Sequence, residues 1–407
     1  MQDSEDISWA APFLSDLPTP SYVYRKSALL EGARRLSGLL PASARVLFSL
    51  KANPQPAIAA LLDRAGISPE VASEGEYAAC LVAGIATNRI VVGGVAKSKD
   101  FLRRACVGRV AAITVDSIGE LERLRAVDDS MPPARLLLRV NPGIAIGGLD
   151  MGGDSQFGLS IEQAMDVVRS RDFGCHEFLG LHFYLGSQRL KVEPIVRSVT
   201  LVRDVLRRFV SERLVVPTVD VGLGCGVTYL ERDSPLDYED LGAGLRNIWR
   251  DPAWMGTQIW SEAGRALVGH AGWFVCRVLE RKELNGKTFV LTDGGLNVHN
   301  PGVGLGRFLK GNPKFRFLQM TPDTRSETVD ICGSLCTSAD RLGNAVTAPR
   351  LSEGDLILIP NAGAYCHTTA LWGFNSQPSF REAILDEKGS FDWVDSQPVV
   401  AAKCKVW

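Results

Sequence analysis

With 407 residues, the chain is longer than one compact core usually holds, so we expect two domains. A hydrophobic content of 45%, a charged content of 22% and a formal net charge of -1 are ordinary for a globular protein and give no basis for attraction to nucleic acid or a membrane. Neither a signal peptide nor a membrane span is predicted, and the nine cysteines, scattered without CxxC pairs, favour reduced thiols in the cytoplasm over a disulfide framework or a metal site.

Residues 21–271 repeat one rhythm, in which a short apolar run precedes an amphipathic segment and a glycine. The apolar runs, which we predict as strands, include 45–50, 89–92, 111–115, 135–140, 178–185, 218–221 and 258–260. Alternating strands and helices imply parallel pairing with right-handed crossovers. About seven or eight such units fit a closed (β/α)8 barrel better than a doubly wound sheet, because no GxGxxG motif follows the first strand.

The pattern changes after residue 271. Short apolar runs alternate there with Gly, Pro and Asn turns, and they are found at 273–279, 288–292, 329–332, 355–360 and 399–404. This texture predicts a second, mainly β domain. We expect the residues before 21 to join it, so the predicted domains are 21–271 for the barrel and 1–20 with 272–407 for the β domain.

The first barrel strand ends on Lys51, and a turn-forming Asn-Pro pair follows it. One interpretation is a surface amine, since lysines are seldom buried without a partner. The other is a desolvated amine with a lowered pKa, able to form an imine with a carbonyl cofactor. Functional side chains of such barrels gather at the carboxyl ends of the strands. Other polar residues expected there are Ser73, Asn141, His182, Tyr184 and Glu262.

Two further strand ends suit ligand binding. Gly222, Gly224 and Gly226 follow an apolar run at alternate positions, which lets backbone N–H groups approach an anion, although a tight turn explains the same pattern. His182 and Tyr184 alternate along one strand, so both would point into the barrel. Each also fits a role in core packing.

The segment 261–265 places Glu262 and Arg265 beside Gly264 at another strand end. A carboxylate there could keep a pyridine nitrogen protonated while the arginine binds an oxyanion. The alternative is an ordinary ion pair. In the second domain, Cys336, Thr337 and Asp340 share a short turn, which is equally explained as a capped turn. Tyr365 follows an apolar run and offers a phenol to a bound phosphate, or an aromatic ring to the domain boundary.

Taken together and in order, these motifs resemble the fold-type III pyridoxal-phosphate-dependent decarboxylases, the family of diaminopimelate and ornithine decarboxylases. The matching segments are 50–53, 71–73, 115–117, 139–142, 157–158, 186–188, 222–226, 262–265, 336–340 and 363–365. The resemblance implies an alanine-racemase-type barrel followed by a β domain. It also implies a homodimer in which each active site is built from both chains.

The resemblance implies pyridoxal 5'-phosphate as the cofactor. Lys51 matches the lysine that forms the imine, Glu262 the carboxylate that faces the pyridine nitrogen, and Arg265 the arginine beside it. Cys336 matches the cysteine that the partner subunit contributes to protonate the product carbon. The remaining residues expected around the cofactor are Ser73, His182, Tyr184, Ser187, Gly222, Gly224, Gly226, Gly264 and Tyr365.

Four positions depart from the family pattern. Tyr184 stands where a histidine stacks on the cofactor ring, and Leu223 replaces the middle glycine of the loop. Thr337 stands where diaminopimelate decarboxylases carry a glutamate for the distal ammonium of the substrate. Asn300 replaces an arginine, and the tyrosine expected soon after it is absent. The expected substrate-binding residues are therefore Arg265, Asn300, Thr337 and Asp340.

Thr337 and Asn300 both fall where the far end of diaminopimelate is bound, and a missing counter-charge weakens its recognition. We therefore predict decarboxylation of an amino acid or acyl-conjugated diamino acid, similar to the siderophore and antibiotic branch of the family. One alternative is meso-diaminopimelate decarboxylase of lysine biosynthesis. Another is an inactive homologue that binds a partner, against which the retention of Lys51 and Cys336 argues.

Overall fold

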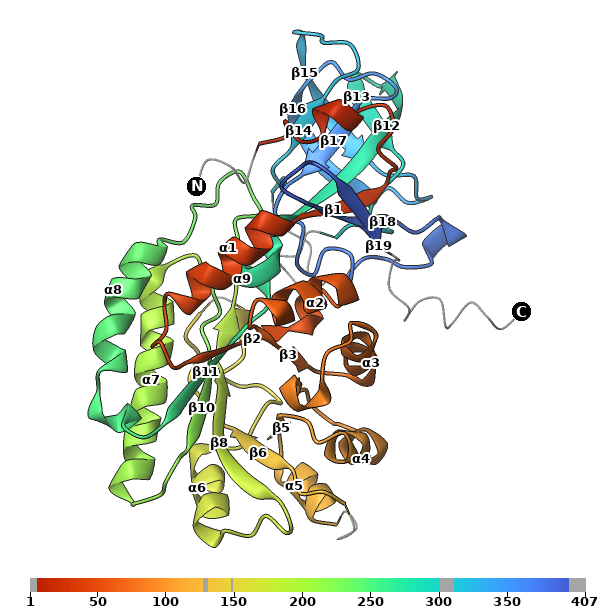
Figure 1. The fold of residues 1–407 in the computed structure, drawn as a ribbon. Coiled ribbons are helices and arrows are strands. Elements are labelled where there is room, and N and C mark those ends of the chain that lie inside the picture. The colour runs from red at the N-terminus through yellow and green to blue at the C-terminus, as the bar shows by residue number, and fades with distance from the viewer. Residues whose placement is uncertain (1–5, 127–130, 148, 301–310, 395–407) are drawn as a thin grey trace. The chain divides into compact units, whose positions relative to one another are not determined.

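The computed structural model describes residues 6–126, 131–147, 149–300 and 311–394 (Figure 1). The chain divides into two compact units, which we describe separately. The barrel unit contains Gly32–Gly226 and Leu236–Ala266, and the sheet unit contains Val227–Pro235 together with residues 6–31 and 267–394. Among the described residues, no helix is both long and apolar enough to span a membrane, and all eight cysteines are free thiols.

Eight parallel strands close the barrel in the order β10-β11-β2-β3-β4-β5-β6-β8, which confirms the predicted (β/α)8 architecture. The strands are β2 (Arg45–Ser49), β3 (Ser68–Val71), β4 (Val91–Val92), β5 (Ala112–Val115), β6 (Arg135–Arg139), β8 (Glu177–Tyr184), β10 (Thr218–Gly222) and β11 (Gln258–Ala263). The helices are α1 (Lys26–Ser37), α2 (Pro56–Arg64), α3 (Glu74–Val82), α4 (Lys99–Val107), α5 (Ile118–Arg125), α6 (Ile161–Ser170), α7 (Val192–Ser211), α8 (Tyr238–Trp249) and the short α9 (Arg265–Val268).

Serine side chains start several barrel helices. Ser73, Ser98, Ser117 and Ser160 each accept a hydrogen bond from the backbone N–H three residues ahead. Such caps satisfy N–H groups that have no partner within the helix. Each cap therefore fixes the point at which the chain leaves a strand end and turns into the outer helical layer.

The sheet unit is built on a nine-stranded sheet whose main order is β16-β15-β13-β12-β1-β18-β19, with β17 bridging β12 and β14. The strands are β1 (Ser21–Arg25), β12 (Gly272–Leu284), β13 (Lys287–Thr292), β14 (Arg316–Leu318), β15 (Ser326–Cys332), β16 (Arg341–Pro349), β17 (Leu356–Ile359), β18 (Arg381–Leu385) and β19 (Phe391–Val394). Its core packs Val23, Trp273, Val275, Leu356 and Leu358 together. The mainly β character of this unit is as predicted, and the strand expected at 399–404 lies outside the described residues.

The first strand lies elsewhere than expected. We assigned residues from 21 onward to the barrel, but β1 pairs with β12 and β18 of the sheet unit. An apolar strand followed by a helix has the same local pattern in either unit, so only the pairing distinguishes them. A two-stranded ribbon of β7 (Leu149–Asp150) and β9 (Gly186–Ser187) lies apart from the barrel ring.

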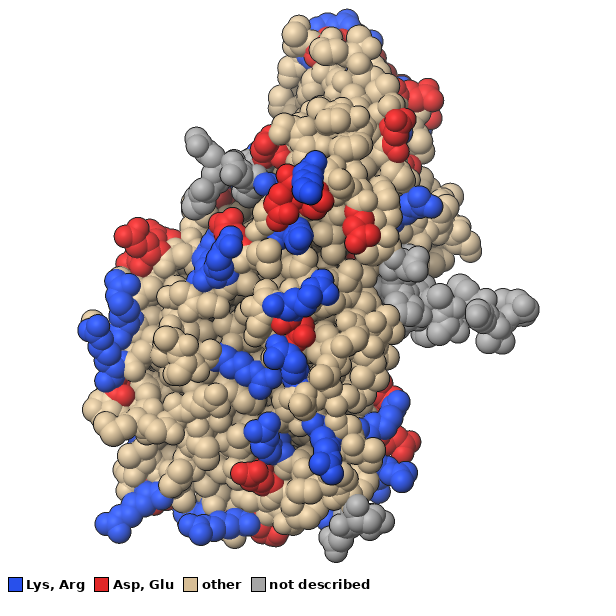
Figure 2. All heavy atoms as spheres, viewed as in Figure 1, with Lys and Arg blue, Asp and Glu red and all other residues tan. Residues whose placement is uncertain are grey.

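Charged side chains of both signs are scattered over the face of the molecule drawn in Figure 2. Figure 2 shows acidic side chains lying among the basic ones on one face of the molecule. Exposed ion pairs such as Arg208–Glu162, which joins α7 to α6 at 3.1 Å, belong to this pattern. Exposed pairs of this kind contribute little to stability.

A buried ion pair links two elements of the barrel. Lys97 Nζ lies 2.7 Å from Glu120 Oε1 on α5, and each side chain is 1% exposed. The amine also donates to the carbonyl oxygens of Gly94 (2.7 Å) and Thr114 (2.8 Å). Burial lowers the pKa of Lys97 and raises that of Glu120, while the charge of each partner opposes the shift of the other.

Replacement of Lys97 by methionine would leave Glu120 buried without its counter-charge. We expect the free energy of unfolding to fall by about 3–5 kcal/mol, measured by urea denaturation followed by circular dichroism. The double variant Lys97→Met/Glu120→Leu removes both charges and should recover most of this loss. Equal losses in the single and double variants would show that packing, not the uncompensated charge, is responsible.

Candidate active site

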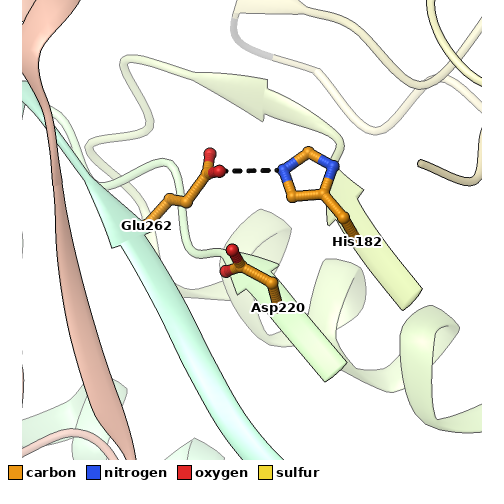
Figure 3. A group of neighbouring side chains, drawn as sticks. All are labelled: His182, Asp220 and Glu262. Carbon is orange, nitrogen blue, oxygen red and sulfur yellow. Dashed lines mark ion pairs between the residues drawn. The ribbon is translucent and has the colours of Figure 1, made fainter. Parts of the chain in front are cut away.

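Three ionisable side chains converge inside the barrel. His182 on β8 and Asp220 on β10 are direct neighbours in the strand register, and Glu262 lies near the end of the next strand, β11. Figure 3 shows the three side chains pointing toward one another, with His182 Nε2 3.0 Å from Glu262 Oε1. All three are almost completely buried. The predicted inward direction of His182 is therefore observed.

The two carboxyl groups of this cluster have opposite protonation tendencies. Burial raises the pKa of Glu262, but the His182 imidazole and the Lys51 charge outweigh it and hold that pKa at about 2. For Asp220, burial and then the negative charges of Glu262 and Glu70 raise the pKa well above its usual range. Two adjacent buried carboxyl groups cannot both ionise cheaply. Glu262 therefore carries the negative charge, and Asp220 keeps its proton.

The cluster also has the composition of a metal site, because one ligand atom from each residue lies within 4.8 Å of the others. A divalent metal prefers ionised oxygen ligands. Binding would have to remove the proton that burial favours on Asp220. In the absence of a cation, the cluster therefore carries one carboxylate charge, at Glu262.

Lys51 lies beside this cluster. It belongs to the short 3-10 helix η3 (Leu50–Ala52) that follows β2, and its Nζ lies 5.0 Å from the centroid of the Tyr184 ring. Its charge lowers the pKa of Glu70, Glu76 and Glu262, so the amine faces the acidic interior of the barrel. Lys51 is half-buried and lies within the site. The lowered pKa of the second interpretation stays a prediction, because neighbouring carboxylates favour the charged form of an amine.

The glycine loop packs against the segment that contains Ser187. Gly224 has φ +70°, and a Cβ added there would lie 2.2 Å from the carbonyl oxygen of Gly186. A Cβ on Gly222 would lie 2.1 Å from the Tyr184 ring. Leu223 does not have a positive φ, so the replacement of the middle glycine causes no backbone strain. Glycine is thus required at 222 and 224 for close packing. The N–H of Gly226 donates to the carbonyl oxygen of Arg189, and anion binding by the rest of the loop stays a prediction.

Three other predicted cofactor residues lie at the ends of barrel strands or at the starts of helices. A Cβ on Gly264 would lie 2.9 Å from the side chain of Ala52, so this glycine lets β11 approach the turn that carries Lys51. Ser73 is exposed and caps α3 by accepting the N–H of Glu76 at 3.2 Å. Arg265 is buried at the start of α9. Direct contacts of these residues with a cofactor stay a prediction.

The other predicted site residues belong to the sheet unit. Asp340 is buried and accepts the N–H groups of Leu296 (2.7 Å) and Leu335 (2.8 Å), so it supports the turn that carries Cys336 and Thr337. Cys336 is exposed. Asn300 donates to the carbonyl oxygen of Thr369 at 3.1 Å. Tyr365, which has φ +67°, is also in this unit, and its meeting with the barrel residues stays a prediction.

Two residues of the site were not predicted. Asp220 directly precedes the glycine loop, but its place beside His182 depends on the register between β8 and β10. Glu70 is buried on β3, a strand that the prediction missed because Ser68, Pro69 and Glu70 interrupt its apolar pattern. A glutamate enclosed by a buried strand is itself a signal of function, since unpaired buried carboxyl groups are costly.

Comparison with known proteins identifies the family. Residues 27–269 match the family model described as the pyridoxal binding domain of pyridoxal-dependent decarboxylases. The chain belongs to this family. The full chain is 32% identical to L-glutamyl-[BtrI acyl-carrier protein] decarboxylase of Niallia circulans over 391 residues, which cover 92% of this chain and 90% of that protein.

Diaminopimelate decarboxylases are also similar. The enzyme of Zymomonas mobilis is 28% identical over 382 residues, covering 90% of this chain and 87% of that protein. The crystal structure of Helicobacter pylori diaminopimelate decarboxylase complexed with L-lysine superposes with a TM-score of 0.83 at 26% identity, covering 94% and 95% of the two chains. The chain is thus a pyridoxal-phosphate-dependent decarboxylase, as predicted.

The barrel residues fit the family's cofactor. An ionised Glu262 suits a protonated pyridine nitrogen, and Lys51 offers an amine near it. Phosphate binding by the loop from Gly222 to Gly226 stays a prediction. Tyr184 lies between the amine and the loop, where an aromatic ring could pack against a planar ligand.

The pKa of Glu70 provides a test of this electrostatic arrangement. Burial, and then the charge of Glu262, raises that pKa to about 7. In the unfolded chain a glutamate ionises above about pH 4.3. Between these two values the unfolded state loses its proton while the folded state keeps it, so Glu70 reduces stability increasingly as pH rises toward 7.

We expect Glu70→Gln to remove this penalty. The cofactor-free variant should melt at a higher temperature than the wild type, with a larger difference at pH 8 than at pH 5, measured by thermal denaturation. Glu122→Gln on the exposed surface of α5 is the matched control and should change neither value. A difference independent of pH would contradict the raised pKa of Glu70.

Proposed function

We propose that this enzyme decarboxylates an amino acid whose far end is attached to an acyl carrier, most simply as a carrier-protein thioester, in a pathway of specialised metabolism. The observation that carries the proposal is the neutral character of Thr337 and Asn300. The Thr337 hydroxyl accepts the N–H of Ala339 within its own turn at 3.3 Å, and the Asn300 amide donates to Thr369. Neither residue offers a charge to the ammonium and carboxylate at the far end of free diaminopimelate.

A thioester or amide at that end needs no counter-charge. Because an unpaired polar group at a binding site weakens recognition, neutral residues favour a conjugated substrate over a free diamino acid. The similarity to a glutamyl carrier-protein decarboxylase along nearly the whole chain supports the same choice. Biosynthesis of a siderophore or an antibiotic is the proposed setting, and the cytoplasmic location inferred from the cysteines stays a prediction.

The cofactor supplies the electron sink for the bond pair left when the α-carboxylate departs as CO2. Lys51 would hold the reactive carbonyl carbon of the cofactor, and the Gly222–Gly226 loop with Ser187 and Tyr365 would bind its phosphate. Glu262 keeps its negative charge at neutral pH and would stabilise a proton on the pyridine nitrogen. His182 on β8, two strands away from β11 in the barrel, holds the Glu262 carboxylate in place.

Cys336 is proposed to protonate the α-carbon from the partner subunit of a homodimer. Its exposure in the sheet unit and the hydrogen bond from its backbone N–H to Asn375 (2.9 Å) support a thiol fixed on a surface that another subunit can cover. The retained Lys51, Glu262 and Cys336 argue for an active enzyme over an inactive binding homologue.

The substrate proposal is tested by measuring CO2 release. We expect kcat/KM for glutamyl carrier-protein thioester, or another carrier-bound amino acid, to exceed that for free diaminopimelate, ornithine and lysine by at least about tenfold. Thr337→Glu adds a counter-charge for a distal ammonium and should shift this ratio toward diaminopimelate, whereas Thr337→Gln should not. A wild-type preference for free diaminopimelate would favour the alternative, lysine biosynthesis.

The shared site is tested by mixing two inactive variants. Lys51→Ala and Cys336→Ala should each lower turnover strongly, and Cys336→Ala should retain the cofactor. If each site combines Lys51 of one chain with Cys336 of the other, dissociation and reassociation of an equal mixture should restore about a quarter of wild-type activity. Absence of recovery, despite hybrid dimers detected by mass spectrometry, would contradict the shared arrangement.

A further inference from the structure

Arg189 lies directly behind the glycine loop and follows the Gly186-Ser187-Gln188 motif. Its backbone N–H donates to the carbonyl oxygen of Gly224 (3.1 Å), and its carbonyl oxygen accepts the N–H of Gly226 (2.9 Å). These two bonds make Arg189 the bridge partner of Cys225, the residue between the two glycines. The loop therefore takes its position from the backbone of this arginine.

The side chain of Arg189 is buried among neutral acceptors. The residue is 2% exposed, and its guanidinium donates to the carbonyl oxygens of Gly147 (Nε, 3.3 Å) and Leu185 (Nη2, 2.8 Å) and to the hydroxyl of Ser198 (Nη1, 2.6 Å). Among the described residues, no carboxylate lies within ion-pair distance of it. Burial lowers the pKa of Arg189, yet an arginine stays protonated at neutral pH.

An uncompensated buried charge is expensive for a folded protein. The hydrogen bonds to three neutral oxygens satisfy the N–H groups but supply no negative charge. The charge of Asp150 favours the protonated guanidinium, but Asp150 is exposed and no ion pair joins it to Arg189. A closer counter-charge could lie on the far side of the backbone that the guanidinium contacts.

The backbone next to the guanidinium includes Gly186 and Gly224, which belong to the Gly186-Ser187-Gln188 motif and to the glycine loop. A Cβ placed on Gly186 would lie 2.8 Å from Arg189 Nη2, and a Cβ on Gly224 would lie 3.5 Å from Nη1. The absence of a side chain at Gly186 lets Nη2 approach so closely, whereas a Cβ on Gly224 would make ordinary van der Waals contact with Nη1. The positive charge therefore lies one layer of backbone away from the surface that is expected to bind the phosphate of the cofactor.

We propose that Arg189 is a positioning residue whose buried positive charge is balanced by the phosphate dianion of the cofactor across the Gly222–Gly226 loop. It acts in two ways. Its backbone holds the loop in place through the bonds to Gly224 and Gly226, and its guanidinium makes the potential at the loop more positive. The inference rests on the cofactor of the family and not on the proposed substrate.

Comparison of pyridoxal 5'-phosphate with pyridoxal, which lacks the phosphate, isolates this effect. Both are titrated into the cofactor-free full-length chain and followed by the visible absorbance of the bound form. We expect Arg189→Gln to weaken binding of the phosphorylated cofactor about tenfold and that of pyridoxal by less than about twofold. Arg189→Lys keeps the charge and should retain most of the wild-type preference. Equal weakening of both ligands would show a purely structural role and overturn the proposal.

A second pair of variants tests the charge without removing the arginine. Ser198→Asp places a carboxylate beside the guanidinium and should reduce the preference for the phosphorylated form, whereas Ser198→Asn, of the same size, should not. If Arg189→Gln does not fold, the two Ser198 variants still test whether the charge of Arg189 favours binding of the phosphorylated cofactor. Arg45→Gln is the control: Arg45 begins β2, donates to Ser68 and should affect stability but not the preference. An unchanged preference in Ser198→Asp would contradict the proposal.

Discussion

Glu262 remains charged inside the barrel because His182 lies 3.0 Å away and Lys51 lies nearby, and the rest of the candidate site depends on that charge. The interior also contains Asp220 and Glu70, and neighbouring buried carboxyl groups cannot all ionise. Burial raises the pKa of both Asp220 and Glu70, and the negative charge of Glu262 raises each of them further. The contact between His182 and Glu262 thus affects the protonation of carboxyl groups on three strands, β11, β10 and β3.

The fold followed from local patterns wherever those patterns were complete. Apolar runs separated by amphipathic segments predicted seven of the barrel strands, because a parallel strand buried on both faces is apolar throughout. The eighth strand, β3, was not predicted because Pro69 and Glu70 interrupt its apolar pattern. Strand β1 was assigned to the barrel because its partners, β12 and β18, are more than 240 residues distant in sequence, roughly two domain lengths on the usual scale.

The site was predictable where a motif is continuous in sequence and not where it depends on strand register. Lys51, Glu262 and the glycine loop each end a recognisable run, and their order resembles the family. The role of Asp220 can be recognised only from the pairing of β8 with β10, which places it beside His182. Arg189 likewise is unremarkable in sequence, and its buried guanidinium becomes apparent only when the segments around Gly147, Leu185 and Ser198 meet.

The division into two units explains how the substrate end could change while the cofactor end was retained. The residues assigned to the cofactor ring lie in the barrel unit, where every charge affects the pKa of its neighbours, so a substitution there alters several groups at once. Thr337 lies in the sheet unit, in a turn whose shape is fixed by Asp340 through the N–H groups of Leu296 and Leu335. The Thr337 hydroxyl adds one bond to this turn, from the N–H of Ala339, whereas Asp340 accepts two. A different side chain at position 337 would therefore lose only one bond of the turn that carries Cys336.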